Sequence, residues 1–113
     1  MARDLGSDRY ATTAARSCGA TTGYATVVRV GRASESQDDA EEVFVADSDH
    51  GAARAGGGGR IWTEVVWTKK GQLSINYASG ARVFKQRTTA KQASISYRAT
   101  EPYMMPPPSL RQP

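Results

Sequence analysis

The sequence predicts a small, mainly β protein with one domain, built as an antiparallel sheet or a partly open barrel. Three observations support this fold class. A chain of 113 residues suits a single hydrophobic core. Its patterned segments are rich in β-branched and aromatic residues that alternate with polar ones. Helical periodicity is weak, so we expect at most one short helix, with an α+β fold as the alternative.

The clearest pattern lies in the second half of the chain. In IWTEVVWT, residues 61–68, side chains alternate between two faces, with Trp62 on the same face as Glu64. KKGQ supplies a glycine-containing turn before LSINYAS, and SGA supplies another before RVFKQ. ASISYRA then alternates again, with Tyr97 on the apolar face. We expect a four-stranded antiparallel meander at about 61–99.

The rest of the chain gives weaker signals. YATVVRV and VFVA are short strand candidates, and a short helix would fit either 9–18 or 34–42, the latter with Ser36 as its cap. The expected organisation has three parts: a flexible or weakly helical N-terminus at 1–23, a β-rich domain at 24–99 with a mobile acidic and Gly-rich loop at 47–60, and a Pro-rich extended tail at 100–113.

Charge is distributed unevenly along the chain. The net charge is +4, but residues 35–50 hold seven acids and no Lys or Arg, while residues 51–113 hold ten Lys or Arg and two acids. A basic half of this kind is where an anionic partner would bind.

The basic meander provides the candidate site. Its cations could follow a phosphate backbone, and Trp62 could stack on bases if it is exposed on the polar face. We therefore hypothesise a surface for nucleic acid or another polyanion formed by Arg60, Trp62, Lys69, Lys70, Arg82, Lys85, Arg87 and Arg98.

Three other interpretations compete with this hypothesis. Basic side chains on outward faces and turns can serve only to keep a small sheet soluble. The acidic segment 35–50 could fold back on the basic face and mask it. A protein partner could instead use a sheet edge, the acidic segment or the Pro-rich tail.

No catalytic or cofactor-binding constellation is visible. The AGGGGRIW run at 55–62 has glycines before Arg60, but no Lys-Ser/Thr pair follows them, so it is not a P-loop. Asp47, Asp49 and His50 offer metal ligands in a loop without the spacing of a known site. We expect a binding module and not an enzyme, with no cofactor and no bound metal.

Cysteine and hydropathy patterns bear on location. Cys18 is the only cysteine, so a disulfide-stabilised scaffold is excluded. No segment approaches the roughly 20 apolar residues of a membrane span. We expect a cytoplasmic protein with no membrane partner, and the sequence leaves its oligomeric state open.

Overall fold

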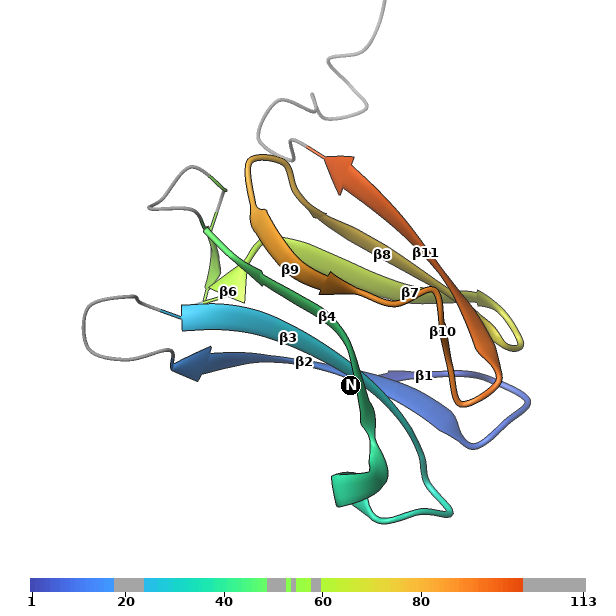
Figure 1. Cartoon of the computed structure of the whole chain (residues 1–113). Coiled ribbons are helices and arrows are strands. Elements are labelled where there is room, and N and C mark those ends of the chain that lie inside the picture. The colour runs from blue at the N-terminus through green and yellow to red at the C-terminus, as the bar shows by residue number, and fades with distance from the viewer. Residues whose placement is uncertain (18–23, 49–52, 54, 58–59, 101–113) are drawn as a thin grey trace, which may run out of the picture.

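The computed structural model describes residues 1–17, 24–48, 53, 55–57 and 60–100, and these form two β-sheets packed face to face as an open sandwich (Figure 1). The five-stranded sheet has the order β1-β2-β3-β4-β9, and all its neighbours are antiparallel. Its strands are β1 (Ala2–Arg3), β2 (Arg9–Ser17), β3 (Tyr24–Arg32), β4 (Glu41–Asp47) and β9 (Arg82–Gln86).

The four-stranded sheet has the order β10-β11-β8-β7. Its strands are β7 (Thr63–Lys69), β8 (Gln72–Ala78), β10 (Thr89–Ala90) and β11 (Ala93–Thr100). A short separate pair joins β5 (Ala55–Gly57) to β6 (Arg60–Ile61). The predicted mainly β fold is confirmed, and the helical content of the described residues is one 3-10 turn, η1 (Gln37–Asp39), with Ser36 as its cap.

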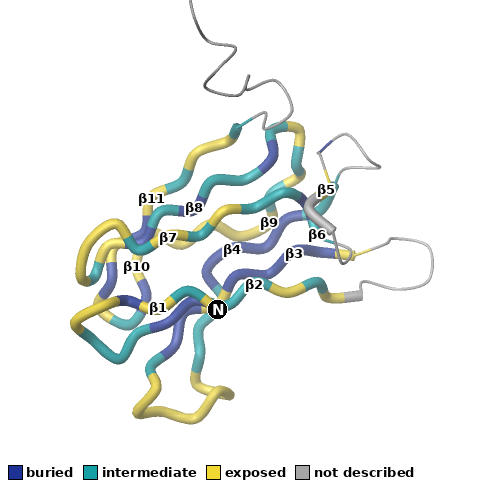
Figure 2. The backbone as a smooth tube through the Cα atoms, turned by 180° about the vertical axis from the view of Figure 1, so that it is seen from behind, coloured by how far each residue is buried: buried dark blue, intermediate teal, exposed yellow. Residues whose placement is uncertain are grey.

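The core lies between the two sheets because each strand turns its alternate apolar residues inward. From the five-stranded sheet, Val28, Val30 and Phe44 are fully buried, and they meet Leu73 and Ile75 of β8. Figure 2 shows this burial running along the central strands β3 and β4. The opposite face of the five-stranded sheet is therefore the outer surface at these strands.

The pairing within 61–99 differs from the predicted meander. Only β7 and β8 form the expected hairpin; β9 leaves for the other sheet and pairs with β4, and β11 pairs with β8 in parallel. The turn at Gly80, which has φ of +86°, precedes this crossing, and Val83 then packs against the core from the five-stranded sheet. Alternation fixes which side chains share a face, but it does not say which strands are neighbours.

The prediction of a flexible or weakly helical N-terminus is wrong for residues 9–17. Strand β2 pairs with β3 along nine residues, from Arg9 opposite Arg32 to Ser17 opposite Tyr24. Thr12 and Thr13 favour a strand, and sheet pairing outweighs the helix propensity of the nearby alanines. The folded unit thus includes β1 and β2. The tail at 101–113 and most of the 47–60 loop lie outside the described residues.

Candidate anion-binding surface

The predicted site residues do not lie on one face. Arg82 and Lys85 are on β9 in the five-stranded sheet, Lys69 and Lys70 are at the β7-β8 hairpin, and Arg98 is on β11. Arg60 belongs to β6, and Arg87 follows β9. Because β9 crosses to the other sheet, the single basic face expected from the sequence is divided between two surfaces.

Trp62 is not the exposed aromatic platform that alternation predicts. Its side chain is partly buried against the core, and its carbonyl accepts a hydrogen bond from the Ala78 N–H at 2.9 Å. It lies between β6 and β7, where the strand is interrupted, so the alternation of 61–68 does not extend to it. Phe84 on β9 is the more open aromatic residue, with 60% of its surface exposed.

A compact group of cations lies on the outer face of the five-stranded sheet. The register places Arg16, Ala25, Asp47 and Arg82 in one row across β2, β3, β4 and β9. The adjacent row consists of Ala14, Val27, Val45 and Lys85, and Arg29 lies opposite Glu42. We call Arg16, Arg29, Arg82 and Lys85 the cationic face.

The floor of this face is apolar. Ala25, Val27 and Val45 form a small buried cluster separate from the main core. Beside it, a shallow cavity of about 260 Å³ is lined by Ala14 and Val27 and flanked by Arg16 and Arg29. A planar apolar group could therefore rest between two guanidinium groups.

Glu42 lies at the centre of the cationic face and contacts three of its four cations. Its Oε2 accepts hydrogen bonds from Arg16 Nη1 at 2.7 Å and Arg29 Nη2 at 3.0 Å, and its Oε1 lies 3.7 Å from Lys85 Nζ. Partial burial raises the pKa of Glu42, but the hydrogen bonds and charges of Arg29 and Arg16 outweigh burial and lower it below its ordinary value. Glu42 is therefore ionised at neutral pH.

Arg82 joins the cationic face to the exposed aromatic ring. Its guanidinium donates to both Asp47 oxygens, at 3.2 Å from Nε and 2.6 Å from Nη2. Its Cζ lies 5.2 Å from the centre of the Phe84 ring, within cation-π distance. Asp47 thus holds Arg82 beside Phe84 at the open edge of the sheet.

The acidic segment partly neutralises the basic residues, as the masking interpretation expects. Glu42 and Asp47 pair with the cationic face, and Glu35 pairs with Lys91 at 2.8 Å. Counted over the described residues alone, four cations nevertheless face two carboxylates, which leaves a positive balance on the cationic face. Asp49 and His50 lie outside the described residues, and the part that is described holds no group of three His, Cys, Asp or Glu suited to a metal.

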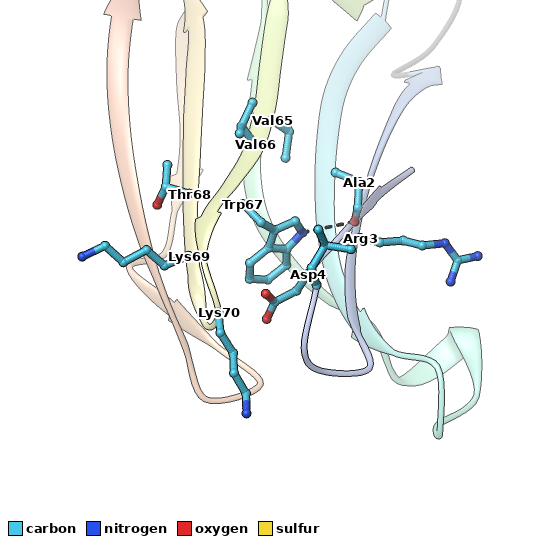
Figure 3. Close-up of a pocket in the computed structure, with 10 residues that line it drawn as sticks. Ala2, Arg3, Asp4, Val65, Val66, Trp67, Thr68, Lys69 and Lys70 are labelled. Carbon is cyan, nitrogen blue, oxygen red and sulfur yellow. Dashed lines mark hydrogen bonds between the residues drawn. The ribbon is translucent and has the colours of Figure 1, made fainter.

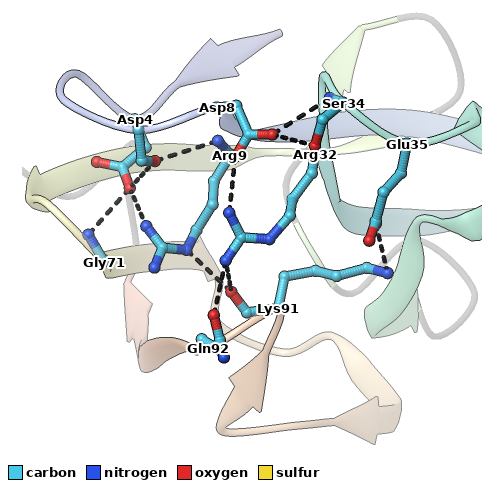
Figure 4. A network of polar contacts seen from close by, with 10 residues as sticks. Asp4, Asp8, Arg9, Arg32, Ser34, Glu35, Gly71, Lys91 and Gln92 are labelled. Carbon is cyan, nitrogen blue, oxygen red and sulfur yellow. Dashed lines mark hydrogen bonds and ion pairs between the residues drawn. The ribbon is translucent and has the colours of Figure 1, made fainter.

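A second polar cluster closes one end of the sandwich (Figure 4). Lys91 and Gln92 adopt positive φ angles of 51° and 64°, which cost energy in residues other than glycine. The Lys91 carbonyl accepts from Arg9 Nε at 2.9 Å and Arg32 Nη2 at 3.2 Å, and the Lys91 N–H donates to Glu41 at 3.1 Å. These groups are engaged in holding the turn, which gives the cluster a structural role.

Tyr97 occupies the apolar face, where the sequence placed it. Its hydroxyl has one hydrogen, which the carbonyl oxygens of Val43 at 3.0 Å and Arg87 at 2.6 Å share, and burial raises the pKa of Tyr97 to about 12. It links β11 to the five-stranded sheet and is not available for stacking.

Arg16 and Arg29 were missed by the sequence interpretation. Arg16 fell in a segment assigned to a flexible N-terminus, and it joins the cationic face through the pairing of β2 with β3. Arg29 carried a usable signal, because it interrupts the apolar run YATVVRV at a position that alternates with Val28 and Val30. It therefore had to point away from the core.

No protein-family model, no curated protein and no solved structure matches this chain. Within the residues that the structure describes, no helix is long and apolar enough to cross a membrane. Any assignment of function thus depends on the surface itself.

Proposed function

We propose that this chain is a non-enzymatic binding module that holds single-stranded nucleic acid across the cationic face. The observation that carries the proposal is the meeting of three cations around one carboxylate on an open sheet surface, with a fourth cation, Arg82, beside an exposed aromatic ring. Basic side chains that alternate with stacking surfaces suit a strand of phosphates and bases.

Each part of the face has a role in this proposal. Arg16 and Arg29 present planar guanidinium groups that can bind phosphate oxygens in pairs, and Lys85 adds a point charge. Phe84 offers a ring on which a base can stack, an interaction worth roughly 1–3 kcal/mol per base. The apolar floor at Val27 accommodates the non-polar faces of sugar and base.

A single strand suits this surface better than a duplex. Proteins that read the major groove insert a helix or a two-stranded ribbon. The helical content of the described residues is one 3-10 turn, which is too short to enter a groove. The cations lie instead across an open sheet face. Sheet surfaces with exposed aromatic residues favour unstacked bases.

We also infer a cytoplasmic location, because the single cysteine, Cys18, gives the chain no disulfide to form in an oxidising compartment.

Salt dependence of binding tests the proposal. We expect the fluorescence anisotropy of a labelled oligothymidine of about 12 nucleotides to rise on binding, with affinity falling steeply between about 50 mM and about 200 mM salt. In the variant Arg29→Ala/Lys85→Ala, the slope of log affinity against log salt should shrink by about 1.4, since each lost phosphate contact removes about 0.7.

The matched control is Lys69→Ala/Lys70→Ala, which removes two cations from the β7-β8 hairpin, outside the cationic face. This variant should keep most of the wild-type slope. No anisotropy change at the lower salt concentration, or an equal loss in both double variants, would refute the proposal.

A further inference from the structure

A second surface lies where the two sheets meet without pairing. Strands β1 and β7 are the outer strands of separate sheets, and no ladder joins them. A groove of about 360 Å³ runs between them, lined by Ala2 to Leu5 on one side and by Val65 to Lys70 on the other (Figure 3). The Trp67 indole crosses it and donates to the Ala2 carbonyl at 3.1 Å.

The groove follows the edge of β7. Six consecutive residues, Val65 to Lys70, line it, although neighbouring residues of a strand point to opposite faces. A cavity in contact with residues of both faces must lie against the strand's edge. An edge of this kind presents backbone donors and acceptors to a partner.

The rim of the groove is positively charged. Arg3, Lys69 and Lys70 line it and have no ion pair with any described residue. The acid in the lining, Asp4, is buried, and its Oδ2 accepts from Arg9 Nη1 at 3.0 Å. In Figure 3, Arg3 and Lys69 extend to opposite sides of the groove, and Lys70 extends from its end. The accessible charge is therefore positive on both sides.

Apolar side chains accompany these cations. Leu5 is 85% exposed and Val66 is 45% exposed, so both leave carbon surface in water beside the groove. A partner that covers them gains about 25 cal/mol for each Å² of apolar area removed from water.

We propose that this groove binds an extended acidic peptide segment of a protein partner. The segment lies along the β7 edge, where its backbone meets the strand. Alternate side chains of an extended peptide point to opposite sides, so carboxylates reach Arg3 on one rim and Lys69 on the other. An apolar side chain between them covers Leu5 and Val66. This site is independent of the cationic face.

Peptide titration tests the groove. The probe is a peptide of about eight residues, the length of a longer strand, in which pairs of adjacent Glu residues are separated by single Val residues, so that carboxylates project from both sides, and its ends are blocked. Isothermal titration calorimetry should detect binding of this peptide and none of a Lys-Val counterpart. We expect Lys69→Glu/Lys70→Glu to weaken binding at least about tenfold, because like charges now face the peptide. The milder Lys69→Gln/Lys70→Gln should weaken it less, and circular dichroism should confirm that both variants fold.

Arg29→Glu/Lys85→Glu, on the other surface, is the matched control and should retain the wild-type affinity. Equal binding of the acidic and basic peptides, or full affinity in Lys69→Glu/Lys70→Glu, would overturn the proposal. A loss of oligothymidine affinity in Lys69→Glu/Lys70→Glu, with that affinity kept in Arg29→Glu/Lys85→Glu, would also overturn the proposal, because it would assign the groove to nucleic acid. If the protein self-associates and the peptide does not compete with this self-association, the edge binds a second copy of the chain and the proposal is wrong.

Discussion

In the proposed function, a phosphate takes the place of the Glu42 carboxylate among the cations of the cationic face. Glu42 contacts Arg16, Arg29 and Lys85, so an incoming anion must compete with its carboxylate for the same donors. Neutralising this side chain should release the cations and raise the local positive charge. We predict that Glu42→Gln binds oligothymidine several-fold more tightly at low salt, as measured by anisotropy.

Glu64→Gln is the control for this prediction, because Glu64 lies on β7 and its carboxylate accepts from Asn76 Nδ2 at 3.2 Å. This variant loses the same charge, but on the four-stranded sheet and away from the cationic face. Its affinity for oligothymidine should therefore change much less. Weaker binding in Glu42→Gln would show that the carboxylate organises the cations and does not compete with the ligand.

Asp8 pairs with Arg32 at 2.6 Å in the polar cluster at one end of the sandwich and makes that cluster sensitive to acid. Hydrogen bonds from the Ser34 hydroxyl and from Arg32 lower its pKa to about 2, against an ordinary value of 3.8. Because the folded pKa is the lower one, its stabilising effect is complete above about 3.8 and is lost as the pH falls towards 2. We predict that the wild type loses urea resistance more steeply over this interval than Asp8→Asn does. Parallel curves would show that ionised Asp8 does not stabilise the fold.

At the scale of elements, Gly31 on β3 leaves room for the ring of Tyr10, its partner on β2. A Cβ at this position would lie 2.6 Å from Tyr10 Oη and 2.7 Å from its Cζ, closer than real contacts allow. Tyr10 is buried, so its ring has little room to move. We predict that Gly31→Ala lowers the free energy of unfolding by about 1–3 kcal/mol in urea titrations.

A double-mutant comparison isolates this contact. In a Tyr10→Ala background, the clash is removed, and Gly31→Ala should cost clearly less than it does in the wild type. An equal cost in both backgrounds would place the strain elsewhere. One such place is Ala40, whose Cβ would lie 3.1 Å from the Cβ added at position 31.

The sequence predicted individual strands better than their arrangement. Alternation identified the β7-β8 hairpin and the apolar face of β11, because these features depend on neighbouring residues. It could not reveal that β9 pairs with β4 or that β11 is parallel to β8, because those contacts join distant segments. Alanines in β2 misled the interpretation of the N-terminus for the same reason, since its pairing with β3 decides its conformation.

The candidate site followed the same division. Arg82 and Lys85 were predicted and do lie together, because the register shift in the β4-β9 pairing puts both on the outer face, although residues three apart on a regular strand point to opposite faces. Arg16 and Arg29 join them across the sheet register, and Trp62 drops out because the strand breaks beside it. Charge composition therefore identified a basic surface, while strand order determined which cations compose it.

For the molecule as a whole, strand crossing separates the two proposed binding surfaces. The cationic face lies on the outside of the five-stranded sheet, and the groove lies at the seam between β1 and β7. None of the four cations of the cationic face lines the groove. The two proposals therefore stand or fall separately, and paired variants on the two surfaces serve as controls for each other.

The most direct measurement of the central claim is a nitrogen-15 NMR titration of the intact chain with oligothymidine at low salt. The account predicts that amide shifts concentrate on β2, β3, β4 and β9, with the largest at Arg29, Phe84 and Lys85, and that Lys69 to Gly71 stay unchanged. Shifts centred on the β7-β8 hairpin, or none at a saturating concentration of oligothymidine, would contradict it.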